Sequence, residues 1–325
     1  MTQGDLESTA ALFDRLGRRK LLIVSGKGGV GRTTVAALLG LALAREDRRV
    51  LVATTGHDDR LAWLLGGDRL PAKPTRLGPN LWVQRLVPRE CVTEFGALTL
   101  RSRRLSGLVL DNPLVRRLLR AIPGLDDFAV LGKAWHEAVR GSDYDVVVFD
   151  GAASGHLRFN LGVAKAIYDT VPDGPLRREA QEIDRSLRNP DHVGAVLVGL
   201  PQSWPLTELA TLAGDLSREV GLSVATLVVN GFARLPVGLE AAVARAQQAL
   251  AEGAPTRPGL VPTVAFLGRV IDRHQRQREQ LASWLAGPSM SSFRGAARLH
   301  VPWRVEGFAA PEDLRALLAT VEVAS

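Results

Sequence analysis

The stretch "VSGKGGVGRTTVAALL", from Val24 to Leu39, decides how the rest of the chain is interpreted. Its glycines let the backbone turn tightly and let several amide groups face one anion. Residues 21–25 before it are apolar and predict a buried strand, and residues 33–45 predict a helix whose positive N-terminal end faces the same anion. This order predicts a nucleotide phosphate site. Its predicted members are Gly26, Lys27, Gly28, Gly29, Val30, Gly31, Arg32, Thr33 and Thr34.

Two residues at the start of this helix carry most of the expected chemistry. The hydroxyl of Thr33 is placed to hold Mg²⁺ beside the phosphates. Phosphate loops of this kind carry lysine at the position of Arg32, where a compact charge contacts the β- and γ-phosphates. Arginine keeps the charge, but its head group is larger, planar and forked. Arg32 therefore either binds phosphate in a shifted position or blocks it.

Further apolar runs predict the other strands of an α/β fold. The runs are Val50–Thr54, Val146–Phe149, Ala195–Gly199 and Ala225–Val229. Each is apolar on both faces, as expected of a central parallel strand. Helical patterns such as residues 206–220 separate them. This alternation predicts a doubly wound, mainly parallel sheet.

One region interrupts the alternation. Residues 87–140 have helical patterns and no strong strand signal, so we expect a helical subdomain of two to four helices inserted into one domain that spans residues 1–325. Leu114, Leu118, Leu119 and Ile122 follow helical spacing there, either as a packed face or as an exposed binding surface. Residues 251–261 are rich in proline and glycine and predict a loop. Leu314, Leu317, Leu318 and Val321 share one face of a C-terminal helix, which we expect to pack on the sheet.

Composition narrows the classes of partner. The formal charge is +7 and the pI about 10.2, but the arginines are spread along the chain, so we predict no nucleic-acid binding. Cys91 is the single cysteine, which excludes a disulfide within the chain and a Cys-x-x-Cys metal clip. The sequence contains no 18-residue apolar run and no apolar stretch near its start that resembles a signal peptide. We therefore expect a cytoplasmic protein without stable membrane insertion.

Several stretches together resemble a known family. "SGKGGVG-TT" is similar to the deviant phosphate loop (Walker A motif) of the family that contains the arsenite-pump ATPase, the ATPase that targets tail-anchored proteins, MinD and the nitrogenase iron protein. "YDVVVFDGAASGH", "VLVGLPQSWPLTELATLAGDL", "LVVNGF" and "PGLDDFAVLGKAWHEA" resemble the arsenite-pump and tail-anchor branch, here termed ArsA-like, and disfavour MinD. The resemblance runs from about residue 19 to residue 323. It implies a P-loop nucleotide hydrolase fold of the SIMIBI type.

The resemblance also implies roles for individual residues. Lys27 would act in trans, on the nucleotide held by the partner subunit of a dimer. Asp150 would bind Mg²⁺ through water, and residues 151–156 would form the second switch. Asn230 would read adenine, which an amide that both donates and accepts can do. The implied cofactors are ATP or ADP with Mg²⁺, the implied metal residues are Thr33 and Asp150, and the implied catalytic residues are Lys27 and Asp150.

The chain departs from the family pattern at several positions. Arg32 replaces the loop lysine. Gly56 stands where relatives carry the aspartate that positions the attacking water. Asp58 and Asp59 are close in sequence, and they either substitute for that aspartate or belong to a solvated acidic loop. Gln202 stands where relatives often carry glutamate. The paired cysteines of the arsenite pump and of the eukaryotic tail-anchor ATPases are absent, so neither arsenite transport nor a zinc-bound dimer is expected. His57 and His156 lack metal-ligand spacing.

These observations predict an ATP- or ADP-binding ArsA-like protein that acts as a dimeric, nucleotide-dependent switch with weak or absent hydrolysis. Its partner would be a second copy or an active paralogue, and a protein client is expected but not identified. The alternative is a non-enzymatic module that binds a client or protein partner and uses nucleotide only as a structural ligand. A MinD-like membrane positioner would need a basic amphipathic tail, and Arg315 is the one basic residue in the C-terminal segment 311–325.

Overall fold

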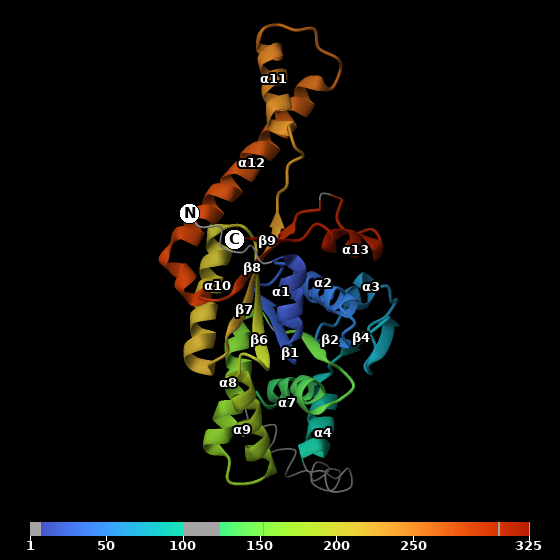
Figure 1. Ribbon diagram of the computed structural model, residues 1–325, viewed down its shortest axis with the longest axis vertical. Helices are drawn as coiled ribbons and strands as arrows, with labels where there is room; N and C mark the ends of the chain where they lie inside the picture. Colours follow the sequence, from blue (N-terminus) through green and yellow to red (C-terminus); the bar gives the residue numbers. More distant parts are fainter. Residues whose placement is uncertain (1–7, 100–123, 152, 305, 325) are drawn as a thin grey trace.

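The computed structural model describes residues 8–99, 124–151, 153–304 and 306–324 (Figure 1). The strands in these residues are β1 (Leu21–Gly26), β2 (Val50–Thr54), β3 (Thr75–Gly78), β4 (Leu81–Arg85), β5 (Val146–Asp150), β6 (Val193–Gly199), β7 (Val224–Phe232), β8 (Ala297–Pro302) and β9 (Glu322–Ala324). The α-helices are α1 (Thr9–Gly17), α2 (Arg32–Arg45), α3 (Arg60–Leu64), α4 (Pro88–Thr99), α7 (Leu125–Trp135), α8 (Ser154–Thr170), α9 (Pro175–Leu187), α10 (Ser203–Asp215), α11 (Leu239–Ala251), α12 (Leu260–Ala286) and α13 (Glu312–Leu318). Short π- and 3₁₀-helices are η1 (His136–Arg140), η2 (Leu216–Val220) and η3 (Pro288–Phe293).

The described strands form one sheet in the order β3-β4-β2-β5-β1-β6-β7-β8-β9. All pairs from β4 to β8 are parallel, and β3 and β9 add antiparallel edges. The chain moves from β1 to β2 on one side and later crosses to β6 on the other, so the strand order reverses beside β1. Ligands of such sheets bind at the carboxyl ends of the strands at this reversal. The predicted doubly wound, mainly parallel sheet is confirmed.

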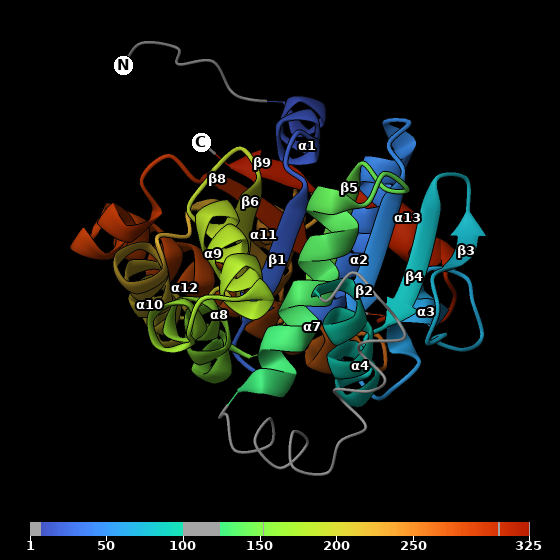
Figure 2. The ribbon, with the colours of Figure 1, turned by 90° about the horizontal axis from the view of Figure 1, so that it is seen from below.

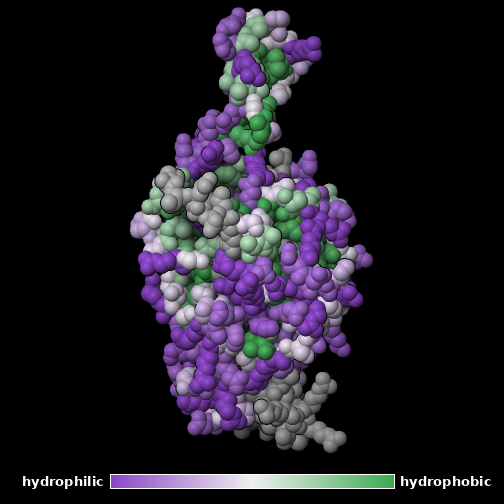
Figure 3. Space-filling model, viewed as in Figure 1, coloured by the Kyte–Doolittle hydropathy of each residue, from purple (hydrophilic) through white to green (hydrophobic). Residues whose placement is uncertain are grey.

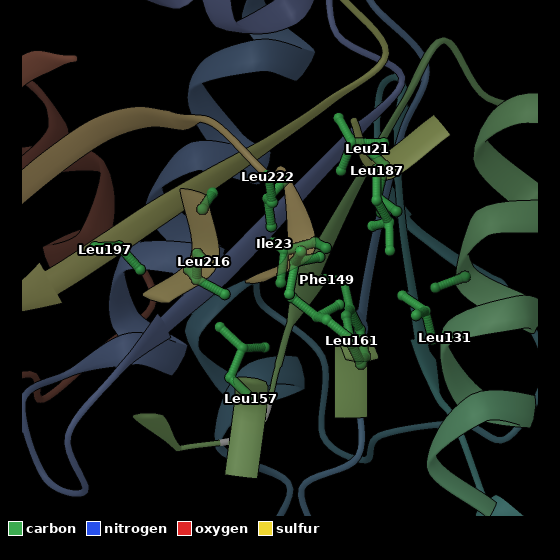
Figure 4. Packing of buried hydrophobic residues seen from close by; sticks show 14 of the residues in the cluster. Leu21, Ile23, Leu131, Phe149, Leu157, Leu161, Leu187, Leu197, Leu216 and Leu222 are labelled. Atoms are coloured by element: carbon green, nitrogen blue, oxygen red, sulfur yellow. The ribbon is translucent and has the colours of Figure 1, made fainter. Parts of the chain in front are cut away.

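Helices cover both faces of the sheet (Figure 2). Alternate residues of β1 explain why: Leu21 and Ile23 belong to one buried cluster with α7 to α10, whereas Leu22 and Val24 belong to the other with α1, α2 and α13. Figure 4 shows the first cluster, where Ile23 and Phe149 from the sheet lie among leucines of the covering helices. Removing such side chains from water anchors the strands whose ends carry the phosphate loop.

The region between β4 and β5 is helical where it is described. It contains α4, α7 and η1, in agreement with a helical segment at 87–140. The predicted face of Leu114, Leu118, Leu119 and Ile122 lies outside the described residues. α8 and α9 pack against α7 and α4 at the same end of the molecule, so the helical layer there extends beyond the segment that the sequence indicated (Figure 1).

A pair of helices projects from the opposite end. α11 and the first half of α12 extend away from the sheet and pack on each other through Val243, Val264 and Ile271 (Figure 1). Hydrophobic side chains show on this projection in Figure 3, and Val261 and Phe266 are among the exposed ones. The sequence predicted only a loop at 251–261. The loop occupies residues 252–259, and the prediction is wrong at its end because α12 already begins at Leu260.

The C-terminal helix is present, but it is shorter than predicted, because α13 ends at Leu318 and Val321 follows it. It packs mainly on α2, within the buried cluster that also contains one face of the sheet. Leu314, Leu317, Leu318 and Val321 are buried, and α13 lies against α2. None of the helices in the described part of the chain is long and apolar enough to cross a membrane.

Candidate nucleotide site

The phosphate loop joins β1 to α2. Gly31 precedes α2 with a φ of +91°, a backbone conformation that favours glycine. A Cβ at Gly28 or Gly29 would meet no atom within 4 Å, so open space lies over the loop where an anion would sit. The loop amides and the start of α2 therefore fit a phosphate group.

The loop is held by close backbone contact with β6. Gly26 pairs with Val198 in the parallel register, and a Cβ at Gly26 would lie 2.1 Å from the carbonyl oxygen of Val198. A side chain at this position would push two backbones apart. Gly26 thus fixes the position of the loop against β6.

An oxygen-rich centre lies at the end of β5. The hydroxyl of Thr33 donates to Asp150 Oδ2 at 2.7 Å, and the hydroxyl of Thr54 donates to the same oxygen at 3.2 Å. Thr54 is the register partner of Asp150 on β2, which explains the second contact. Hard oxygen groups of this kind are the preferred surroundings of Mg²⁺. The arrangement brings together both predicted metal residues, and it adds Thr54, which the sequence showed only as the last residue of a strand.

The Asp150 carboxylate is only 6% exposed, and this burial raises its pKa above the ordinary value. Hydrogen bonds from Thr33 and Thr54, and the charge of Arg32, act in the opposite direction. Burial has the larger effect, so the pKa is raised overall. Full compensation of the buried negative charge therefore needs additional positive charge. A divalent cation would supply it, so the donor set fits Mg²⁺.

Arg32 contacts the segment after β5 that the sequence predicted as the second switch. Its Nη1 donates to the backbone carbonyl oxygen of Gly151 at 2.5 Å, directly after the end of β5. The guanidinium therefore bridges α2 and the segment that follows Asp150. An additional role of Arg32 in phosphate binding, one of the two possibilities raised by the sequence, would require this contact to break.

Lys27 lies against α10. Its Nζ donates to Glu208 Oε1 at 3.0 Å and stands 5.4 Å from the centre of the Trp204 ring. The sequence pointed to Lys27 from the loop pattern, but no sequence signal connected it with Glu208, which is 181 residues away.

Gly56 lies in the loop between β2 and α3. The amide of Gly56 donates to Thr54 Oγ1 at 3.0 Å. Asp59 accepts from the amide of Leu70 at 2.8 Å and pairs with Arg85 at 3.1 Å, so its carboxylate has a structural role. Of the two nearby acids considered as substitutes at Gly56, Asp58 is the one whose charge acts on Asp150 and raises the pKa of that group.

Asn230 stands at the end of β7, beside the loop. Its Nδ2 donates to the carbonyl oxygen of Val30 at 2.8 Å and lies 2.2 Å from where a Cβ at Gly31 would be. Both residues line a cavity of about 460 Å³ that opens next to the loop. The cavity is also lined by Arg60, Leu200, Trp303, Arg304 and Phe308. Apolar walls with a few polar groups suit a nucleotide base. The sequence analysis did not identify Trp303 and Phe308. Two aromatic residues that closely follow the alternating run of β8 are the sequence feature that could have indicated them.

Within the described residues, no three His, Cys, Asp or Glu side chains gather as a metal-binding group. His57 lines a separate cavity of about 220 Å³ with Asp127 and Asn160. Cys91 is buried, which raises the pKa of its thiol to about 12 and makes it unreactive.

Known proteins resemble this chain over a range that contains the candidate site. Residues 19–167, which include the phosphate loop and Asp150, match the family model described as anion-transporting ATPase. The ATPase BagA of Mycobacterium tuberculosis is 24% identical over 285 residues, which cover 80% of this chain and 81% of that protein. An arsenical pump-driving ATPase of Escherichia coli is 29% identical over 220 residues, which cover 66% of this chain and 35% of that protein. The matched region thus spans about a third of the arsenical pump's length.

The matched range contains the strand, loop and helix that form the phosphate site, and the fold around them is the mainly parallel sheet of P-loop nucleotide hydrolases. The chain is similar to ATPases of the ArsA-like family, and this similarity supports a nucleotide-binding P-loop protein.

Proposed function

We propose that this chain is a dimeric switch that binds ATP or ADP with Mg²⁺ and hydrolyses ATP weakly or not at all by itself. The observation that carries the proposal is the hydrogen bond from Arg32 to the backbone of Gly151. Arg32 occupies the position of the loop lysine, and this bond engages its charge with the protein instead of with a phosphate. The side chains of Thr33 and Asp150, which would hold Mg²⁺, are in contact with each other, whereas Gly56 has no side chain to position water. Binding is therefore favoured over turnover.

Mg²⁺ at this centre would neutralise phosphate charge, the main task in phosphoryl transfer. Thr33 and Asp150 would hold it, and the loop amides would hold the phosphates. Lys27 would contact the nucleotide of the partner subunit. The helical segment at about 87–140 would be the subdomain of a single domain that the nucleotide state opens or closes for a client protein.

Asn230 supports a preference for adenine. Its Nδ2 donates to the Val30 carbonyl oxygen, which fixes the orientation of the amide, and its Oδ1 is the acceptor that would pair with the exocyclic amine of adenine. The same oxygen would meet the carbonyl oxygen of guanine, which is also an acceptor. The preference should be about tenfold or more, the usual effect of one unpaired buried polar group.

The proposal is tested by calorimetric titration of the purified chain with ATP, ADP and GTP, each with Mg²⁺, beside a phosphate-release assay. We expect binding of both adenine nucleotides, weaker binding of GTP, and little phosphate release. Asn230→Ala should reduce the difference between ATP and GTP. Absence of heat and of any nucleotide-dependent change in melting temperature would rule the proposal out.

A degenerate site suggests an active partner. Lys27 is retained while Arg32 and Gly56 depart from the family pattern, which supports a heterodimer in which this chain acts in trans on a paralogue with an intact loop. Mixing the two proteins is expected to form a complex with higher phosphate release than the paralogue gives alone. Adding a Lys27→Ala chain is the matched control, because it should leave the rate unchanged.

The alternative is a module that binds a partner protein and uses nucleotide only as a structural ligand. The exposed side chains of Val261 and Phe266 on the α11–α12 projection favour this alternative function, since apolar side chains on a projecting element are typical of binding surfaces. Nucleotide binding with no turnover, even together with the paralogue, would favour it.

A further inference from the structure

The side chain of Lys27 is engaged on both sides. Glu208 Oε1 accepts its hydrogen bond at 3.0 Å, and Glu208 Oε2 lies 2.9 Å from the same nitrogen. The ammonium group also faces the ring of Trp204, one turn earlier on α10, at 5.4 Å from its centre. A cation between two carboxylate oxygens and an aromatic face is held in one orientation.

Glu208 is itself kept in place. The side chain of Trp204 forms a hydrogen bond with it, and this contact, followed by that of Lys27, lowers the pKa of the carboxyl group. Glu208 is therefore ionised across the neutral range and ready to pair with Lys27. The three side chains Lys27, Trp204 and Glu208 are termed the α10 latch below.

The latch lies at the surface. The side chain of Lys27 is 47% exposed, that of Glu208 is 39% exposed, and Trp204 is 72% exposed. Ion pairs in contact with water are weak, so this one is easily exchanged for a stronger anion. A nucleoside triphosphate with its cluster of negative oxygens is such an anion.

A single ammonium group cannot stay between the two oxygens of Glu208 and contact a phosphate elsewhere. We propose that Glu208 is a positioning residue that holds Lys27 on its own chain, and that a nucleoside triphosphate draws Lys27 away from it. This inference rests on the proposed role of Lys27 toward a phosphate, and it adds that the lysine is withheld until nucleotide arrives. Release also frees Trp204 from its cation, so the exposed indole reports the state of the site.

The latch is tested by the rate at which an amine-reactive reagent labels Lys27, read by mass spectrometry of the full-length chain without nucleotide. Glu208→Gln removes the charge and keeps the shape, and we expect Lys27 to be labelled about fivefold faster. Lys165, which pairs with Asp169 on α8, is the internal reference and should be unchanged. Glu240→Gln on α11 is the matched control for loss of one exposed carboxylate. Trp204→Phe keeps an aromatic ring but removes the indole donor, and it should give a smaller increase.

The second measurement repeats the labelling with Mg-ATP and with Mg-ADP. ATP is expected to change the labelling rate of Lys27 and the fluorescence of Trp204 in the wild type. Equal labelling of Lys27 in the wild type and in Glu208→Gln would overturn the latch, whether or not nucleotide binds. If Glu208→Gln speeds the labelling of Lys27 without nucleotide, but ATP leaves the wild-type labelling rate unchanged while calorimetry shows that ATP is bound, the release step is overturned. Failure of ATP to bind in the calorimetric titration would instead remove the proposed function and leave the first comparison intact.

Discussion

Replacing Arg32 by lysine is expected to tighten the binding of Mg-ATP by about 10- to 100-fold. In the wild type, the guanidinium donates to the Gly151 carbonyl oxygen and is thereby engaged by the protein backbone. A lysine stem is narrower and its ammonium group is a compact charge, so it fits between the glycine backbone and the phosphates. One or two charge-assisted hydrogen bonds regained at about 1.5–3 kcal/mol correspond to this gain.

The measurement is a calorimetric titration of wild type and Arg32→Lys with Mg-ATP and with Mg-ADP. The gain should be larger for ATP, because the restored cation contacts the terminal phosphates. Arg32→Met is the matched control, since it also breaks the contact with Gly151 but supplies no charge. Equal gains in the lysine and methionine variants would show that Arg32 acts by obstruction alone. Weaker binding in Arg32→Lys would show that Arg32 is itself a phosphate ligand.

Phosphate release by these variants separates binding from turnover. We expect Arg32→Lys to remain slow, because Gly56 still offers no group to position water. A Cβ at Gly56 would approach Thr54 Oγ1 at 3.3 Å, so a side chain fits there with a small adjustment. The double variant Arg32→Lys, Gly56→Asp is therefore the form in which turnover should appear. Rapid turnover of the wild type would contradict the view that these two positions silence the site.

Replacing Asp150 by asparagine should have opposite effects on stability and on metal-dependent binding. The nucleotide-free protein should melt a few degrees higher, because a buried carboxylate, disfavoured by its surroundings, is replaced by a neutral group of the same shape. Thr33 and Thr54 can donate to the asparagine oxygen as they do to Asp150 Oδ2. Binding of Mg-ATP should weaken by about 10- to 100-fold, the usual result of losing an outer-shell partner of a metal.

The pH dependence follows from the direction of the shift. Burial raises the pKa of Asp150 in the folded state above its unfolded value, so the folded protein binds more protons in the window between the two values. The stability contributed by this group is present below the unfolded pKa and is lost as pH rises through the folded pKa. The melting temperature of wild type relative to Asp150→Asn should therefore fall with rising pH in that window and stay lower above it.

Melting curves from pH 3 to pH 8, with and without Mg-ATP, test both statements. Mg-ATP should stabilise the wild type above the window, where the carboxylate is charged, and should stabilise Asp150→Asn much less. Asp126→Asn, at the start of α7, is a control for the loss of one acidic charge outside the site. A wild type that is more stable than Asp150→Asn without ligand at neutral pH would contradict the burial argument.

The local elements of the nucleotide site could be predicted from the sequence because their causes are local. Apolar runs flanked by glycine gave the strands β1, β2, β5, β6 and β7 to within a few residues, and the loop pattern placed α2. The edge strands β3 and β9, and their neighbours β4 and β8, were not predicted. They are short or half-exposed, and their signals are weaker than those of strands buried on both faces. The α11–α12 projection was not predicted, and its internal core is small, with Val243, Val264 and Ile271 as its buried residues.

The sequence by itself determined the phosphate loop, the central parallel strands and the resemblance to ArsA-like ATPases, because glycine spacing and apolar runs act through neighbouring residues. Only the tertiary structure decided the contacts between distant segments. Thr54 meets Asp150 because β2 and β5 are paired in register, and Arg32 reaches Gly151 because α2 starts beside the end of β5. Lys27 meets Glu208 because β6 leads α10 past the loop. Such contacts depend on how elements pack, and no pattern along the chain encodes which charged group will stand opposite another.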